Sequence, residues 1–72
     1  MNRYIIFESY PDTLYWISKE TEAFYVLRTL LDVNGQWYWG SEFGFIDGEP
    51  MTVYKTIPKQ FRQQAYEAFL HE

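Results

Sequence analysis

The sequence predicts a small α+β fold in which an antiparallel sheet carries helices on one face. Three observations lead to this prediction. Short runs of β-branched and aromatic residues alternate with turn residues, as in antiparallel strands. Two other stretches repeat apolar residues with the period of an α-helix. The chain has only 72 residues but contains 7 Tyr, 6 Phe and 3 Trp, enough large side chains to give one domain, residues 1–72, a core.

The first two strands are expected to form a hairpin. Residues 3–8 are a run of mostly β-branched and aromatic side chains, which favours a strand. Pro11 and Asp12 then supply a turn, since Pro fixes φ near a turn value and Asp can bond the backbone ahead of it. Residues 14–17 return as the second strand. Their period of two places Leu14 and Trp16 on one face and Tyr15 and Ile17 on the other.

Residues 18–33 fit two structures. A period of 3.6 residues gathers their apolar side chains on one side of a helix, which Asn34-Gly35 would end. The same Asn-Gly pair is also the preferred two-residue turn of a β-hairpin, which would join the segment to residues 36–39 as a strand. We favour the helix, because a strand would place two charged residues, Arg28 and Asp32, on its apolar face.

The next segments are expected to form a second hairpin. Residues 36–45 are extended on either interpretation, with Gly40 and Gly44 marking bends. Asp47-Gly48 turns the chain, and residues 51–56 return as a strand. The two extended segments are therefore expected to pair with each other.

The last helix begins near Pro58, because a proline in the first turn loses no hydrogen bond there. Its apolar residues form a narrow stripe of Phe61, Ala65, Ala68 and Phe69. The predicted order is thus strand, strand, helix, strand, strand, helix, with a four-stranded antiparallel sheet and both helices packed on one face. If residues 18–33 are a strand, the alternative is a β-meander with a single C-terminal helix.

The chain lacks the usual groups for catalysis. It contains no cysteine and a single histidine, His71, beside the C-terminus. Its serines have no nucleophile-elbow sequence around them, and its acidic residues match no calcium-loop spacing. We therefore expect no catalytic residue, no metal site and no cofactor, and we expect that the protein is not an enzyme.

Negative charge is concentrated in the middle of the chain. The net charge is −4, and no Lys or Arg occurs between Arg28 and Lys55. An acidic segment repels phosphates, so direct nucleic-acid binding is not expected. The N-terminal apolar run is too short for a signal peptide or a membrane span. Together with the lack of cysteine, this predicts a cytoplasmic protein without membrane association.

The same middle segment holds the candidate binding residues. Alternation along the strand places Tyr38 on the opposite face from Trp37 and Trp39. Aromatic residues are enriched at protein interfaces, and a negative rim attracts a basic partner. The predicted partner-binding residues are Trp37, Tyr38, Trp39, Glu42, Phe43, Asp47 and Glu49.

These features predict a non-catalytic protein-interaction domain that binds another protein with a basic surface. In size, acidity and lack of catalytic groups the chain resembles the small inhibitors that phages and mobile elements carry. That resemblance implies an antagonist of host defence that blocks a nucleic-acid-handling host protein, such as a nuclease or a surveillance complex. Two alternatives stay open: an aromatic surface that stacks bases or sugars, and a strand edge that pairs with its own copy in a homodimer.

Overall fold

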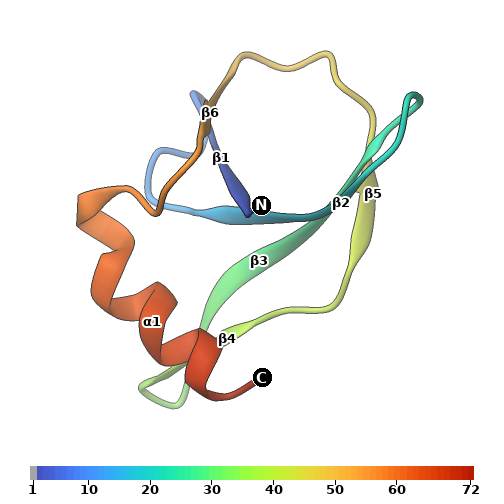
Figure 1. Ribbon diagram of the computed structural model, residues 1–72. Coiled ribbons are helices and arrows are strands. Elements are labelled where there is room, and N and C mark those ends of the chain that lie inside the picture. Colours follow the sequence, from blue (N-terminus) through green and yellow to red (C-terminus); the bar gives the residue numbers. More distant parts are fainter. Residues whose placement is uncertain (1) are drawn as a thin grey trace.

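The chain folds into strands followed by a C-terminal helix, as a computed structural model that describes residues 2–72 shows (Figure 1). A short 3-10 helix, η1, leads directly into the α-helix. The elements in these residues are β1 (Arg3–Phe7), β2 (Tyr15–Glu20), β3 (Tyr25–Val33), β4 (Gln36–Trp39), β5 (Phe43–Phe45), β6 (Met51–Tyr54), η1 (Lys59–Phe61) and α1 (Arg62–Leu70). The α+β class is confirmed, whereas the predicted four strands and two full helices are wrong.

All the strand pairs are antiparallel, in the order β4-β3-β2-β1-β6, and β5 pairs with the first half of β3. β3 therefore pairs with two strands, β4 and β5, along the same edge. Leu30 lies opposite Trp39 of β4, and Leu27 lies opposite Phe43 of β5. The residues between, from Gly40 to Glu42, bend the chain, as the glycine at the start of this link indicated.

The helix predicted over residues 18–33 is wrong, because these residues belong to β2 and β3. Asn34 and Gly35 have φ values of 53° and 82°, and two positive values in succession define the type I′ turn of a tight hairpin. Asp32 supports this turn by accepting a hydrogen bond from the Gly35 N–H at 2.9 Å. The alternative with a single C-terminal helix describes the chain better, although the sheet has more pairings than a meander.

The predicted second hairpin is also wrong, because β6 pairs with β1 and not with β5. Ile5 of β1 lies between Tyr15 of β2 and Val53 of β6. The sheet curves so that β5 and β6 stand on either side of its open side, which the link of residues 46–50 arches over (Figure 1). The turn at Asp47-Gly48 thus belongs to a longer connection between strands that are not neighbours.

The inner face of this curve holds one of two core clusters. Ile5 and Leu27 are fully buried there, with Phe7 and Ile17 beside them. The rings of Phe7 in β1 and Phe45 in β5 are 4.9 Å apart, although β2 and β3 separate these strands in the sheet. That contact is possible only because the sheet is curled, so this cluster fills the inside of a half-open barrel.

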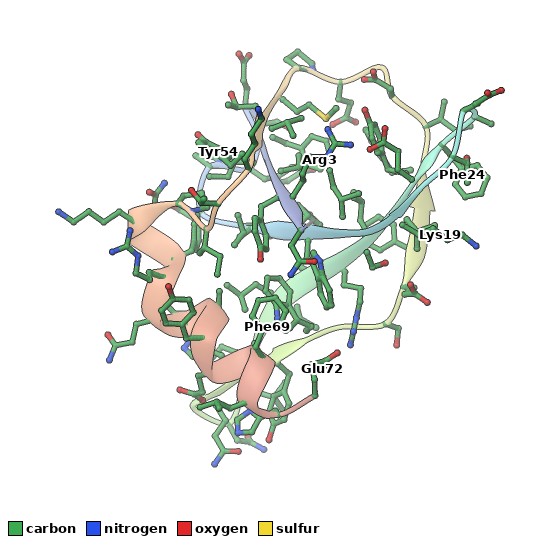
Figure 2. All side chains as sticks on the ribbon, in the orientation of Figure 1. Arg3, Lys19, Phe24, Tyr54, Phe69 and Glu72 are labelled. Carbon is green, nitrogen blue, oxygen red and sulfur yellow. The ribbon has the colours of Figure 1, made fainter. Side chains whose placement is uncertain are left out.

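The outer face of the sheet packs against α1. Ala65 and Ala68 are fully buried, so the helix backbone lies close to the strands, as the small residues of the predicted stripe indicated. Phe69 points from α1 towards the sheet (Figure 2). Its ring is 5.0 Å from Trp16 and 5.2 Å from Trp39. Within residues 2–72, neither helix has the length and apolar character that crossing a membrane requires.

Candidate functional site

The predicted binding residues divide between the core and the surface. Trp39 is only 4% exposed, and its ring lies 6.3 Å from Tyr4 and 5.5 Å from Trp16. Trp37 is half-buried on the same face, under α1. The two tryptophans therefore build the contact between helix and sheet, and Trp39 in particular offers no surface to a partner.

The outer edge of β4 is closed by side chains from the end of the chain. The Trp37 N–H donates to Glu67 Oε2 at 2.8 Å, and His71 Nδ1 donates to the Trp37 carbonyl at 2.8 Å. Tyr38, on the face opposite Trp37, stacks on His71 with ring centroids 4.5 Å apart, and its hydroxyl donates to Gln36 Oε1. Polar groups that an edge strand would otherwise expose are thus satisfied within the molecule.

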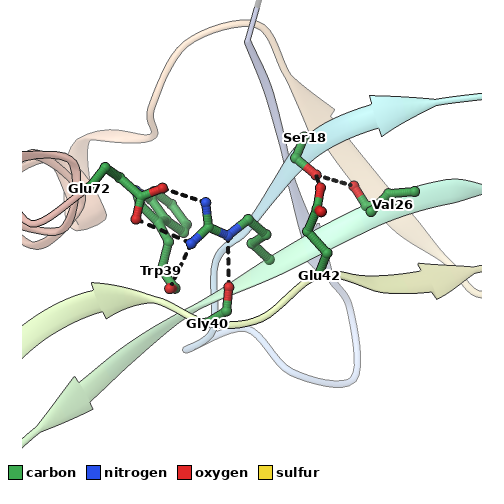
Figure 3. Close-up of polar contacts among 7 residues, drawn as sticks. Ser18, Val26, Trp39, Gly40, Glu42 and Glu72 are labelled. Carbon is green, nitrogen blue, oxygen red and sulfur yellow. Dashed lines mark hydrogen bonds and ion pairs between the residues drawn. The ribbon is translucent and has the colours of Figure 1, made fainter.

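Arg28 completes this closure where β4 ends, and Figure 3 shows its partners Trp39, Gly40 and Glu72. Its Nε donates to the Gly40 carbonyl at 2.7 Å, and one terminal nitrogen donates to the Trp39 carbonyl at 3.0 Å. The guanidinium also forms a two-pronged ion pair with Glu72 and lies 5.3 Å from the centre of the Trp16 ring. One side chain therefore links β3, the β4–β5 bend and the C-terminus.

Glu42 is exposed, but its carboxylate has a partner in the molecule (Figure 3). It accepts a hydrogen bond of 2.7 Å from the Ser18 hydroxyl, which also lies 3.3 Å from the Val26 carbonyl. Ser18 is the extra residue of a bulge in β2, where the pairing with β3 shifts. The Glu42 side chain thus reaches across β3 to accept a hydrogen bond from β2, and its carboxylate stays exposed.

Large apolar side chains are exposed around β5. Phe43 is 42% exposed in the strand, Ile46 is 77% exposed just after it, and Phe24 is 40% exposed beside Gly44. Exposed carboxylates stand next to them in the link to β6 and in the β2–β3 turn. We call this surface the β5 rim, and it consists of Glu22, Phe24, Phe43, Ile46, Asp47 and Glu49.

The β2–β3 turn positions Phe24 in the rim. The Thr21 hydroxyl accepts hydrogen bonds from the N–H groups of Ala23 at 3.2 Å and Phe24 at 3.0 Å. The Thr21 N–H donates to the Phe24 carbonyl at 2.9 Å, which closes the turn. A threonine that satisfies the backbone in this way holds a short turn without glycine or proline.

A shallow acidic pocket of about 250 Å³ lies between this turn and the link to β6. Its lining residues are Glu20, Thr21, Glu22, Ala23, Phe24, Tyr25 and Asp47. Arg3 forms an ion pair with Glu20. Lys19 projects from the molecule near the same end (Figure 2). The carboxylates of Glu22, Asp47 and Glu49 therefore outnumber the ammonium group of Lys19, and the described residues give the rim a negative charge.

The inner side of the rim is aromatic. Tyr15 makes edge contacts with Phe7 at 5.1 Å and with Phe43 at 6.0 Å. Burial raises the pKa of the Tyr15 hydroxyl above its ordinary value of 10.0, and the nearby Tyr10 and Glu49 raise it further. Tyr15 thus joins the core at Phe7 to the exposed ring of Phe43 on the inner side of the rim.

Alkaline pH is expected to destabilise the protein through Tyr15. Because its pKa is higher in the folded state, the folded chain still holds this proton when the unfolded chain has lost it, so stability falls as pH rises above about 10. Tyr15→Phe keeps the ring contacts and should lose less stability between about pH 8 and pH 11. Urea unfolding of both proteins at these two pH values measures this difference. Equal losses of stability in both proteins would contradict this role of Tyr15.

The structure brings together some of the predicted residues and adds others. Phe43, Asp47 and Glu49 share the rim, whereas Trp37, Tyr38 and Trp39 lie around β4 and α1. The other rim residues, Glu22, Phe24 and Ile46, were not among the predicted binding residues. The hairpin alternative paired residues 18–33 with residues 36–39 only, and it did not contain the chain reversal at residues 21–24 that brings Phe24 beside β5.

A second pocket of about 240 Å³ lies between α1 and β4, lined by Trp37, Gln63, Gln64 and Glu67. Among these described residues only Glu67 is ionisable, and its carboxylate accepts the Trp37 N–H. Within residues 2–72 no group of three or more His, Cys, Asp or Glu side chains is placed to hold a metal ion. The β5 rim, in contrast, combines exposed apolar side chains with exposed carboxylates. No family model, curated protein or solved structure matches the chain.

Proposed function

We propose that the chain is a non-catalytic protein-interaction domain that binds a basic surface of another protein through the β5 rim. The observation that carries the proposal is the exposure of Phe24, Phe43 and Ile46 beside the carboxylates of Asp47 and Glu49. Exposed aromatic and aliphatic side chains are typical anchors at the centre of an interface. Carboxylates around them accelerate the encounter with a positively charged partner.

The partner class that best matches this chemistry is a protein that handles nucleic acids, because its own binding site must be basic. Occupying such a site would make the chain an inhibitor, of the kind that phages and mobile elements use against a host nuclease or surveillance complex. We place this activity in the cytoplasm, since the chain has no cysteine with which to form the disulfides common in small secreted domains. The stacking of bases or sugars is a weaker proposal, because Trp37 and Trp39 pack under α1.

A capture experiment with a matched control tests the proposal. The rim variant combines Phe43→Ser with Asp47→Lys, and the control combines Tyr66→Ser and Gln63→Lys in α1 with Gln60→Lys in η1. Both variants remove an exposed ring and raise the net charge by two, but only the first alters the rim. Tagged proteins are incubated with a nuclease-treated host lysate, and the retained proteins are identified by mass spectrometry.

We expect the wild type and the α1 control to retain the same basic protein, and the rim variant to retain at least about tenfold less of it. Circular dichroism must show that the rim variant is folded. Raising the salt concentration should weaken capture by the wild type, since salt screens exposed charges. Equal retention by the rim variant would rule out this surface, and a partner lost only in the α1 control would move the site to the helix.

A further inference from the structure

β5 is a strand with one unpaired edge. Among residues 2–72 it pairs with β3 alone, and β6 on the opposite side of the open sheet pairs with β1 alone (Figure 1). Natural sheets usually protect an edge with charged side chains, bulges or covering segments. In this molecule α1 and Arg28 cover the edge of β4, while the edge of β5 is left open.

The backbone groups on this edge can be assigned from the pairing of β3. The Gly40 N–H donates to the Thr29 carbonyl, whereas the Leu30 N–H donates to the Leu14 carbonyl on the β2 side. Odd-numbered residues of β3 thus direct their polar groups towards β4 and β5. Phe43 and Phe45 lie opposite two such residues, Leu27 and Tyr25, so their own polar groups face β3. Gly44, between them, directs its N–H and carbonyl to the open edge.

Gly44 has no side chain, so nothing projects from β5 at the residue whose backbone groups face the open edge. A Cβ added there would lie 3.6 Å from Cδ2 of Phe24, an ordinary contact, so space alone does not explain the glycine. Phe24 packs against it from one face of the strand, and Phe43 and Tyr15 lie on the other. An added strand could therefore bond the free N–H and carbonyl of Gly44 and would contact apolar side chains on both faces of the sheet.

We propose that the β5 edge takes up an extended, basic segment of the partner protein as an additional strand. This inference rests on the proposed function and specifies how the partner binds. In strand addition the backbone provides affinity, and alternate side chains of the guest provide specificity. Here the guest side chains on the Phe43 face would point towards the acidic pocket, because Glu20 and Tyr25 of its lining share that face, and this favours Lys or Arg at alternate positions. The other guest side chains would lie on the opposite face, against Phe24.

Charge decides between a basic partner and a second copy of this chain. If two β5 edges paired with each other, the carboxylates of Glu42, Asp47 and Glu49 of both copies would be brought to one interface. Like charges facing each other across strands are destabilising. A lysine-rich guest strand would meet the same carboxylates with opposite charge, so complementarity favours the basic segment.

The test uses a synthetic heptapeptide that alternates Lys with Val or Thr, and amide hydrogen exchange of the wild-type protein measured by NMR. Two further peptides serve as comparisons: one methylated on alternate backbone nitrogens, which cannot donate to the edge, and one with Glu in place of Lys. Two protein variants test the same edge. Gly44→Pro removes the outward N–H, which an edge strand tolerates, while Gly44→Ala keeps it.

We expect the basic peptide to slow amide exchange at Gly44 and to bind the wild type and Gly44→Ala alike. Binding should be at least about tenfold weaker for Gly44→Pro, for the methylated peptide and for the Glu peptide. The methylated peptide needs no variant, so the test holds even if Gly44→Pro fails to fold. Equal binding of the methylated peptide, or no slowing at Gly44, would overturn strand addition.

The captured partner separates this inference from the proposed function. A partner that is lost by the Phe43→Ser, Asp47→Lys variant and also by Gly44→Pro supports both. A partner lost by the rim variant but retained by a folded Gly44→Pro leaves the proposed function standing and overturns strand addition. Light scattering gives the remaining outcome: a wild-type dimer that Gly44→Pro converts to a monomer would show that the guest is a second copy, against the proposal.

Discussion

Trp39→Ala is expected to lower the free energy of unfolding by about 3–5 kcal/mol, because it empties the centre of the contact between helix and sheet. The Trp39 ring touches Tyr4, Trp16 and Phe69, which come from two strands and from α1. A domain of this size has a total stability at the low end of about 5–15 kcal/mol. The variant should therefore retain only about 0–2 kcal/mol of stability and be partly unfolded at room temperature.

Chemical denaturation followed by circular dichroism measures this loss, and Trp39→Phe is its matched control. Among residues 2–72 the Trp39 Nε1–H has no hydrogen-bond acceptor. Phenylalanine keeps an aromatic ring at the site and removes that unpaired donor, so it should cost less than about half of the loss in Trp39→Ala. A folded Trp39→Ala protein with near wild-type stability would contradict the core role of this ring.

The role of Trp39 also shows how far the sequence could predict the site. Alternation correctly separated Tyr38 from Trp37 and Trp39, because the period of a strand is a local property. Which face is buried depends on where α1 docks, and that contact joins residues about thirty positions apart along the chain. A pattern of neighbouring residues contains no information about it.

The strand at residues 25–33 was mispredicted because Arg28 and Asp32 were assumed to need solvent. Asp32 instead lies beside the hairpin turn and accepts the Gly35 N–H. Arg28 lies on the face that packs against α1, but its long side chain carries the guanidinium to two carbonyls and Glu72. Arg28 is satisfied by partners whose positions depend on the folded chain, and Asp32 stays exposed at the end of β3, so neither charge excluded a strand.

The prediction of a second hairpin was wrong for a related reason. A turn sequence at Asp47-Gly48 between two extended segments is typical of local pairing. In the structure β6 pairs with β1, some fifty residues earlier, because the curled sheet places β1 next to β6 and leaves β5 on the other side. The rim, with its open edge at Gly44, exists only because this local pairing does not form.

Arg28→Met is expected to lower the free energy of unfolding by about 2–3 kcal/mol. Methionine retains much of the apolar stem but loses the guanidinium over Trp16, and it leaves the carbonyls of Trp39 and Gly40 and the Glu72 carboxylate without their donor. These three groups lie where β4 ends and where the C-terminus meets the sheet. Loss of the donor should therefore loosen the end of the chain as well as lower stability, and faster amide exchange at residues 70–72 would report it.

Three variants separate the parts of this effect. Glu72→Gln removes only the charged partner and should cost less than about 1 kcal/mol, because an ion pair this close to solvent is worth little. Arg28→Lys keeps the charge but cannot donate in several directions from one plane, so its loss should approach that of Arg28→Met. Arg62→Met, at an exposed position of α1, should change stability by no more than about 0.5 kcal/mol. If Glu72→Gln costs as much as Arg28→Met, then the ion pair and not the two backbone carbonyls holds this junction together.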